Sequence, residues 1–506
     1  MRRYRFWIGL AALTTATVLA GLALNLYRTL SRPQGWAYVP GPCADGAVFT
    51  VSGNGCGGEG TAFDAEQVYG PSILKDRTTE SAPCPGVPIG ATCYRMWYVG
   101  TVGEARQIGY AVSADGLSWQ RVPGPLPGGS VLGAGAAEAF DGGGVTMPSV
   151  LKEGDVFRMW YAGLNAEHQP NGIGVARSID GLNWTRETTR PVLPKSGREG
   201  VFDRDELPSL SVLKDRAPCV GVSEGGDCYR LWFEGLRTSP DYRFGIGHAV
   251  SADGLKWTRV PGDSEDEAVL TAGWLRSYNT RSVGVPFVLK DGALFRMWYE
   301  AWGNDGLFSL GYAASADGVS WWRPAPLAAA FSGADDPYAA VPDDVWVARV
   351  LKEGVSYRMW YTVSSRPNAH RLAVAEMTPG MPLVALNAKR AEQIVTVSFE
   401  TAQPIPAGGS VLVTLPEGWA AQPESSGGFG REVGWTWEPS AVTDAEARGV
   451  ARGALLLSAS SAIAPGAKEL RFSVQEPGIA RNLPATLYLQ TFSTSEVLEY
   501  GTVGLP

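Results

Sequence analysis

Two glutamates occupy positions at which a repeated phrase of this chain otherwise carries small or apolar residues. Glu234 and Glu300 stand where the equivalent phrases have Val99 and Ala162. Carboxyl groups exchange protons as general acids or bases, and carboxylates accept hydrogen bonds from the hydroxyls of polyhydroxylated ligands. The pattern therefore predicts an acidic ligand site, with a solvated charge on a rim as the alternative interpretation.

A second acidic segment precedes a first strand, and it is expected at the same rim of the propeller as the ends of the second strands. Asp205 and Glu206 lie in the segment 204–208, Arg-Asp-Glu-Leu-Pro, and the aligned segments of the other repeats differ from it. We expect both carboxylates to join the acidic site. Arg281 is expected as a polar partner of the ligand, and Trp302 as a surface on which a sugar ring can stack.

Another group of aspartates recurs at one place in successive repeats. Asp64, Asp141 and Asp203 each follow an aromatic residue and stand eight residues before the serine of a predicted strand. A residue that recurs from unit to unit serves the fold more simply than it serves one reaction. A structural cap at the beginning of each unit is therefore the first interpretation of these aspartates, and catalysis is the second.

These residues are positioned by five repeated units, roughly 60 to 80 residues apart. In the second unit, apolar and aromatic residues predict strands at 149–152, 156–162 and 173–177, and a fourth strand begins at Trp184. Four short strands per unit, without helical periodicity, predict an all-β five-bladed β-propeller. The arginine of the central phrase is expected to pair or stack between blades. The copies of that phrase are Tyr94–Tyr98, Phe157–Tyr161, Tyr229–Phe233, Phe295–Tyr299 and Tyr357–Tyr361.

The last unit lacks its fourth strand, and a matching segment lies near the other end of the propeller. Residues 36–41, Trp-Ala-Tyr-Val-Pro-Gly, match the fourth strands that begin at Trp119 and Trp257. We expect 36–41 to pair with 371–376 and complete blade five, which removes open sheet edges. The propeller is then expected to span residues 33–376.

The first 32 residues have the pattern of a membrane anchor. Met1–Arg5 carries three arginines, and Trp7–Leu24 is uncharged and largely apolar, so the stretch is long enough to cross a bilayer. An uncleaved N-terminal transmembrane helix is expected, with the rest of the chain exported and extracytoplasmic. A cleaved signal peptide, which would leave a secreted protein, is the alternative.

The cysteines fit an exported protein with three disulfides. Six cysteines allow fifteen connectivities, but two pairs stand at the same place in units one and three, within the hairpin between the first and second strands. The spacings do not fit zinc ligands, and the chain has three histidines, so neither a metal nor a cofactor is expected. The expected disulfides are Cys84–Cys93, Cys219–Cys228 and, from the remaining two cysteines, Cys43–Cys56.

Charge and the C-terminal pattern limit the remaining possibilities. The net charge of −8 argues against nucleic acid as a partner. A Pro/Gly linker at 377–382 is followed by several alternating apolar segments with turn signals between them, which predict a β-sandwich over 383–506. A spacer or accessory sugar-binding role is expected for this domain.

The repeated phrases resemble those of the arabinanase/levansucrase/invertase-type five-bladed propellers, which include glycoside hydrolase families 43 and 32. The phrases are Pro-Ser-Val-Leu-Lys, Arg-Met-Trp-Tyr-x-Gly and Ile-Gly-x-Ala-x-Ser-x-Asp-Gly-x-x-Trp, and the resemblance covers roughly residues 36–376. It implies that Glu206, in Glu-Leu-Pro, is the catalytic acid. The Asp-Pro pairs expected in blades one and two are replaced by Gly70-Pro71 and Met147-Pro148.

The resemblance then leaves Asp64 and Asp141 as the nearest choices for the catalytic base and for the residue that tunes the acid. The resulting expectation is an exported, membrane-anchored glycoside-hydrolase-like propeller that acts on a carbohydrate by acid–base hydrolysis. The alternative is a non-catalytic carbohydrate-binding or scaffold propeller at the cell surface, because glycine and methionine stand at two positions where aspartate is expected.

Overall fold

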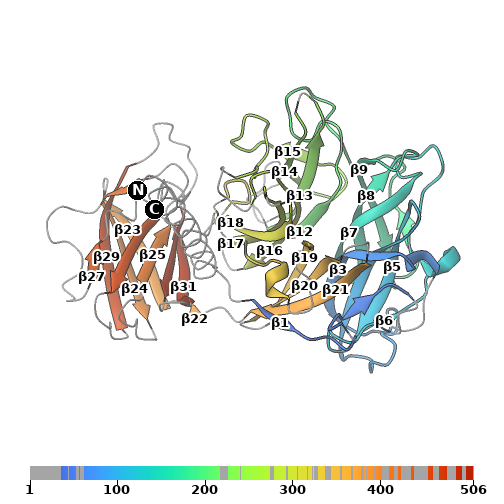
Figure 1. Ribbon diagram of the computed structural model, residues 1–506, viewed down its shortest axis with the longest axis horizontal. Helices are drawn as coiled ribbons and strands as arrows, with labels where there is room; N and C mark the ends of the chain where they lie inside the picture. The colour runs from blue at the N-terminus through green and yellow to red at the C-terminus, as the bar shows by residue number, and fades with distance from the viewer. Residues whose placement is uncertain are drawn as a thin grey trace, which may run out of the picture. The chain divides into compact units, whose positions relative to one another are not determined.

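The computed structural model describes most of residues 36–377 and, beyond them, the backbone of the strands between 381 and 504 (Figure 1). The predicted anchor at 1–32 lies outside the described residues. Within the described part, no helix is long and apolar enough to cross a bilayer. The gaps before residue 377 are 44, 53–55, 57–61, 217–225, 240, 274–278, 292–293, 305, 316, 322, 324–328, 337–343, 354–355 and 366–368.

The chain separates into two compact units. One consists of 36–324 with 331–379, and the other contains 380–506. The described elements are strands, apart from three single turns of 3-10 helix, so the protein is all-β. The 3-10 turns are η1 (Ala62–Asp64), η2 (Pro127–Gly129) and η3 (Gly333–Asp335).

The first unit consists of five successive groups of antiparallel strands, the blades. Blades one and two share one nine-stranded sheet through a single parallel pairing of Arg106 with Gly144. Blade one contains β3 (Gln67–Arg77), β4 (Thr92–Val102), β5 (Ala105–Ser113) and β6 (Gln120–Arg121). Blade two contains β7 (Gly144–Glu153), β8 (Val156–Leu164), β9 (Pro170–Ser178), β10 (Thr185–Arg186) and β11 (Leu193–Pro194). Blade three contains β12 (Leu210–Arg216), β13 (Asp227–Arg237), β14 (Arg243–Ser251) and β15 (Thr258–Val260). Blade four contains β16 (Ser282–Asp291), β17 (Leu294–Trp302) and β18 (Phe308–Ser315).

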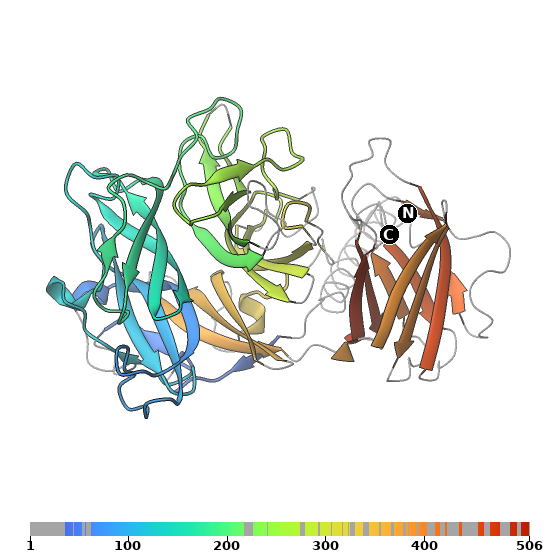
Figure 2. The same cartoon turned by 180° about the vertical axis from the view of Figure 1, so that it is seen from behind.

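Blade five closes the ring with a strand from the beginning of the described chain. It contains β19 (Asp344–Glu353), β20 (Ser356–Ser365) and β21 (Ala369–Met377). The strand β1 (Ala37–Val39) pairs antiparallel with β21, and the short β2 (Phe49–Thr50) pairs with β21 as well. In both ribbon views the blue β1 lies beside the orange β21, although the two are far apart in the sequence (Figures 1 and 2).

Ion pairs connect each blade to the preceding one around the whole ring. A lysine at the end of each first strand meets a carboxylate from the blade before it. The arginine of the central phrase contacts the carboxylate of its own blade, as Arg296 does with Asp291 at 2.8 Å. This set, the lysine ring, includes the pair between blades five and one. Its pairs are Lys75–Glu353, Lys152–Asp76, Lys214–Glu153, Lys290–Asp215 and Lys352–Asp291.

The Ser-x-Asp-Gly-x-x-Trp phrase forms a turn that joins neighbouring blades. Asp115 Oδ1 accepts the amides of Leu117 and Ser118 at 2.8 and 2.7 Å, which fixes the turn. The carbonyl of Gly116 then accepts the indole N–H of Trp360 from blade five at 2.8 Å. The buried tryptophans Trp97, Trp160 and Trp232 donate in the same way to Gly181, Gly254 and Gly318 of the next blade.

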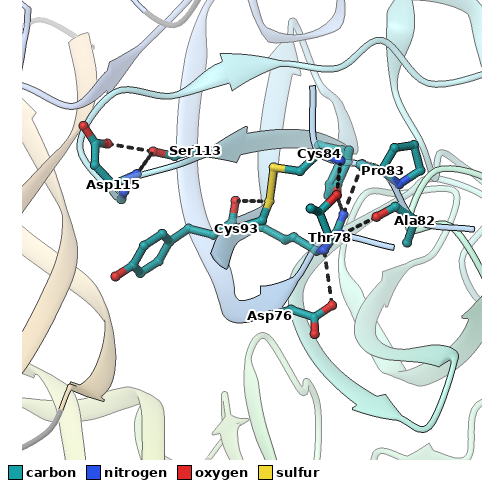
Figure 3. Close-up of a disulfide and its surroundings, with 12 residues drawn as sticks. Asp76, Thr78, Ala82, Pro83, Cys84, Cys93, Ser113 and Asp115 are labelled. Atoms are coloured by element: carbon teal, nitrogen blue, oxygen red, sulfur yellow. Dashed lines mark hydrogen bonds and ion pairs between the residues drawn. A yellow bond between two sulfur atoms is a disulfide. The ribbon is translucent and has the colours of Figure 1, made fainter. Parts of the chain in front are cut away.

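Two predicted disulfides are confirmed. Cys43 bonds to Cys56, and Cys84 bonds to Cys93 across the hairpin between β3 and β4. Figure 3 shows this second disulfide beside Thr78, whose hydroxyl accepts the amide of Cys84 at 2.9 Å. Cys228 is disulfide-bonded, while Cys219, its predicted partner, lies outside the described residues.

The second unit contains two sheets. The larger has the strand order β22-β31-β30-β25-β28-β27, and the smaller has the order β23-β24-β29-β26. Neighbouring strands are antiparallel except β22 and β31. The bounds are β22 (Met381–Pro382), β23 (Val384–Ala391), β24 (Ile394–Thr401), β25 (Ser410–Thr414), β26 (Ala420–Gln422), β27 (Trp435–Trp437), β28 (Ala454–Ala459), β29 (Gly466–Gln475), β30 (Thr486–Phe492) and β31 (Val497–Gly504).

Removing one carboxylate of the lysine ring is expected to destabilise the propeller. Asp291 accepts hydrogen bonds from Arg296, Lys352 and the Tyr357 hydroxyl, so Asp291→Asn leaves two cations with a neutral partner. We expect the free energy of unfolding, measured in urea by tryptophan fluorescence, to fall by about 2–4 kcal/mol. Asp155→Asn, at an exposed hairpin turn, is the matched control, and an equal effect of both substitutions would contradict the prediction.

The same ring predicts loss of stability in acid. For Glu153, Asp215, Asp291 and Glu353, burial alone would raise the pKa, but hydrogen bonds and charges from neighbouring cations outweigh it and lower the pKa. A lowered pKa in the folded state stabilises the fold above the unfolded value, and the effect is lost as the pH falls through the folded value. We expect the melting temperature to drop below about pH 4; an unchanged melting temperature between pH 6 and pH 3 would exclude this contribution.

Candidate active site

The recurring aspartates lie inside the blades, where arginines hold them. Asp64 and Asp141 are 0% and 1% exposed. Asp64 Oδ2 accepts hydrogen bonds from Arg121 Nε and the Tyr98 hydroxyl, both at 2.8 Å, and Arg186 Nε binds Asp141 at 2.7 Å. The equivalent pairs are Asp203–Arg259 and Asp336–Arg371. These contacts fit the structural cap, and the buried carboxylates are poorly placed to act as a base on a ligand in solvent.

The two positions at which the resemblance expects aspartate lie beside the channel axis, in apolar surroundings. Here buried side chains from four blades pack together, and we call this set the apolar layer. Gly70 adjoins it, and a Cβ on Gly70 would come within 2.9 Å of the Met147 sulfur. The residues of the apolar layer are Tyr69, Val99, Met147, Val285 and Val347.

A bulge in the first strand places these residues. The pairing register shifts in blades one, two, four and five at this level. Met147, Val285 and Val347 have φ angles of 48°, 42° and 45° there, which is strained for residues with a Cβ and most of all for valine. Blade three differs, because Ser209 holds the equivalent position and binds a carboxylate.

That carboxylate belongs to Glu234 on β13. Glu234 is 6% exposed, and its Oε2 accepts hydrogen bonds from Ser209 Oγ at 2.7 Å and from the amide of Val285 at 3.3 Å. A Cβ on Gly284 would come within 2.5 Å of Oε1, so the neighbouring blade needs glycine there. Burial, assisted by repulsion from Glu206, raises the pKa of Glu234 to about 7.

Glu300 holds the equivalent place in blade four. Burial raises the pKa of Glu300 well above its ordinary value, and the charges of Glu234 and Asp344 raise it further. Asp344, the first residue of β19, accepts the amide of Phe308 at 2.9 Å. The two glutamates that replace small residues in the repeat therefore interact electrostatically and favour the protonated form.

Glu206 completes this group from the segment that leads into blade three. Its backbone pairs with Leu236 at the end of β13, and its side chain is half-buried. Burial raises the pKa of Glu206; the charge of Lys195 opposes the shift and that of Asp205 adds to it. We call Glu206, Glu234 and Glu300 the acidic rim.

The adjoining Asp205 has a different environment. Burial tends to raise its pKa, but hydrogen bonds from the amide and hydroxyl of Thr238, at 2.7 and 2.9 Å, lower it overall. Asp205 therefore anchors the end of β13, and its pKa is lowered whereas the pKa values of the acidic rim are raised.

Arg281 and Trp302 come together as a pair. The Arg281 guanidinium lies 5.0 Å from the centre of the Trp302 ring, which also stacks on Phe308 at 5.6 Å. The indole N–H of Trp302 is buried and has no hydrogen-bond partner among the residues that the structure describes. The predicted stacking surface is thus already partly covered by its neighbours.

No group of three His, Cys, Asp or Glu side chains that could hold a metal ion occurs in the described part of the chain. A separate hollow of about 830 Å³ beside Asp141 is lined by residues such as Arg186 and Thr188 and does not include the rim.

Comparison with curated proteins identifies relatives in Mycobacterium tuberculosis, although no protein-family model matches the chain. The chain is 30% identical over 268 residues to uncharacterized protein Rv1502 of strain ATCC 25618 / H37Rv, which covers 50% of this chain and 80% of that protein. The match to uncharacterized protein MT1551 of strain CDC 1551 / Oshkosh has the same extent. The chain belongs to the family of these mycobacterial proteins.

Solved structures similar to this member of the family include several glycoside-hydrolase-like proteins. One described as a glycoside hydrolase is 15% identical, with a TM-score of 0.46, and covers 67% of this chain and 92% of its own. The endo-arabinase from Bacteroides thetaiotaomicron is 16% identical, with a TM-score of 0.42, and covers 62% and 96%. A structure reported for the GH130 family of mannoside phosphorylases and hydrolases is 14% identical, with a TM-score of 0.45, and covers 67% and 93%.

The structure adds to the site one residue, Tyr242, that the sequence did not identify. Tyr242 is 65% exposed at the hairpin between β13 and β14, and it packs edge-on against Phe244 at 5.4 Å. Burial raises the pKa of Tyr242, and the charges of Glu206 and Glu234 raise it further. An aromatic residue at an otherwise polar hairpin tip was the signal available in the sequence.

The pKa of Glu234 predicts a stability change near neutral pH. A carboxyl group whose pKa is raised by folding stabilises the fold fully below its unfolded pKa and loses that contribution as the pH rises through the folded value. Between pH 5 and pH 8 we expect the free energy of unfolding of the unmodified protein to fall by about 2 kcal/mol more than that of Glu234→Gln. Urea unfolding at both pH values measures the effect. Glu104→Gln, on a side chain 85% exposed, should show the same pH response as the unmodified protein. If Glu234→Gln also showed that response, the raised pKa of Glu234 would be refuted.

Proposed function

We propose that this protein is a carbohydrate-active propeller that hydrolyses a glycosidic bond at the acidic rim. The observation that supports the proposal is the grouping of Glu206 and Glu234 beside an exposed tyrosine, with both carboxyl groups raised in pKa. Hydrolysis of a glycoside requires one carboxyl group that holds a proton and a second that can accept one. Glu206 is the more accessible of the two and is assigned as the base, although the resemblance alone would make it the acid. Its charge contributes to the raised pKa of Glu234, so Glu234 is the group that holds the proton.

In the proposed reaction, the Glu234 carboxyl donates its proton to the glycosidic oxygen as the bond to the anomeric carbon breaks. Water attacks that carbon and passes a proton to ionised Glu206, so the two carboxyl groups exchange protonation states. With a pKa of about 7, Glu234 is protonated in a substantial fraction of molecules at neutral pH. Tyr242 offers a ring face to a sugar, and Arg281 offers hydrogen-bond donors.

Asp64 and Asp141 have no part in this reaction, because their carboxylates are held by arginines inside the blades. The pattern of residues 1–32 supports the further proposal that the protein is exported and anchored in the membrane by an uncleaved helix. Cleavage of that segment would instead give a secreted protein that acts on the same class of ligand.

A second candidate function is glycan binding without hydrolysis. The apolar layer supports it, because Gly70 and Met147 occupy the positions where the resemblance implies aspartates. In that case the carboxylates of the rim would accept hydrogen bonds from sugar hydroxyls, and Tyr242 would supply the stacking surface.

Turnover of pooled oligosaccharides and aryl glycosides by the full-length chain distinguishes the two functions. We expect Glu206→Gln to reduce kcat at least about 100-fold, because the proton acceptor is lost, and Tyr242→Ala to act mainly on KM. Asp155→Asn, far from the rim in sequence and exposed, is the activity control. Absence of turnover in the unmodified protein, together with saturable glycan binding that Tyr242→Ala weakens, would replace hydrolysis with the second function.

A further inference from the structure

A buried arginine without an acidic partner lies on the innermost strand of blade five. Arg349 is 3% exposed. Its Nη1 donates to the carbonyl of Ala348 at 2.9 Å, and its Nη2 has no hydrogen-bond partner among the described residues. The guanidinium lies 5.4 Å from the ring centre of Phe287 in blade four.

The other buried arginines differ in this respect. Each forms an ion pair with an aspartate, as Arg121 does with Asp64 at 2.8 Å. The remaining pairs are Arg95–Asp76, Arg230–Asp215, Arg237–Asp241, Arg296–Asp291 and Arg371–Asp336. Arg349 is therefore exceptional among the buried arginines in the described part of the propeller.

An unpaired buried guanidinium is costly, because desolvation of a single charge is repaid only by an opposite charge and hydrogen bonds. Burial lowers the pKa of Arg349 to about 10, so the side chain is still cationic at neutral pH. A negative charge is needed beside it, and the described protein residues supply none.

The residues equivalent to Arg349 carry a hydroxyl donor in three of the other four blades. Ser72, Ser149 and Ser211 hold its place in blades one to three, and Phe287 holds it in blade four. Each serine oxygen accepts an amide of the next blade at 2.9 to 3.0 Å, from Val150, Val212 and Val288. No hydrogen bond donated by these hydroxyls is found within the described residues, so each retains a proton to offer. We call this set of five residues the serine level.

The serine level lies between two other layers of the channel. The bulges that form the apolar layer precede it by two residues along the first strands, and the lysines of the lysine ring follow it by three residues. Glu234 of the acidic rim lies at the level of the apolar layer, since it accepts the amide of Val285 at 3.3 Å. The lysine ring lies on the opposite side of the serine level.

We propose that the serine level binds a small monovalent inorganic anion, with chloride as the representative member, through the Arg349 guanidinium and the serine hydroxyls. The anion neutralises the buried charge and connects first strands of different blades. This site is distinct from the acidic rim and does not depend on the proposed hydrolysis.

Bromide provides the direct test, because it resembles chloride in size and charge and scatters anomalously. Crystals of the full-length chain grown with sodium bromide should show an anomalous peak within about 3.5 Å of Arg349 Nη2. In solution, the melting temperature should be about 2–4 °C higher in sodium bromide than in sodium gluconate of equal ionic strength, since the proposed site takes a small inorganic anion and gluconate is a large organic one.

Arg349→Ser introduces the residue of blades one to three and should abolish the difference between the two salts. Arg177→Ser, which removes an exposed arginine, should preserve it. An equal bromide response in Arg349→Ser and the unmodified protein would overturn the proposal, as would bromide-grown crystals of the unmodified protein without a peak in the channel. The diffraction test needs no variant, so it decides the question even if Arg349→Ser folds poorly.

Discussion

The lysine ring is the interaction on which the rest of the propeller depends. Neighbouring blades pack through apolar side chains. This packing sets the distance between blades but is not directional, so it does not fix their position along the strand direction. Each lysine–carboxylate pair fixes that position for one blade relative to the next. The arginine of the central phrase binds the same carboxylate, so the pair is held from both sides. Because the pair between Lys75 and Glu353 has the same form as the others, blade five meets blade one at the register that the other blades use.

Carboxyl groups at the two ends of the first strands have pKa values shifted in opposite directions. At the lysine ring, cations and hydroxyl donors outweigh burial, and Asp291 has a lowered pKa. At the acidic rim, Glu234 has burial and another carboxylate as its main influences, and its pKa rises to about 7. The residue types are nearly the same, and the number of neighbouring cations decides the outcome. The ion pairs of the lysine ring thus stabilise a fold that also holds a few buried carboxyl groups with raised pKa values at the acidic rim.

The sequence allowed the repeats, the strands of each unit and two of the disulfides to be predicted, because all of these depend on local patterns that recur. It also identified Glu234 and Glu300 by their departure from the repeat. The role of Asp64 could not be decided there, since its partner Arg121 lies 57 residues further along the chain. Tyr242 and Arg349 were missed for a related reason. These two residues matter because of the groups around them. Those groups come from segments that are distant in the sequence and that only the fold brings together.

The strand β1 also has a consequence for how the chain assembles. It pairs with β21 across more than 300 residues of sequence, so the ring cannot close until all five blades have been made, and the long loop makes this closure slow. Until then β21 presents an unpaired edge, and the β1 strand of another copy fits that edge in the same register. At high concentration, exchange of this strand between two molecules competes with closure of one ring. The segment that completes the fifth blade is therefore also the point at which two copies can become interlocked during folding.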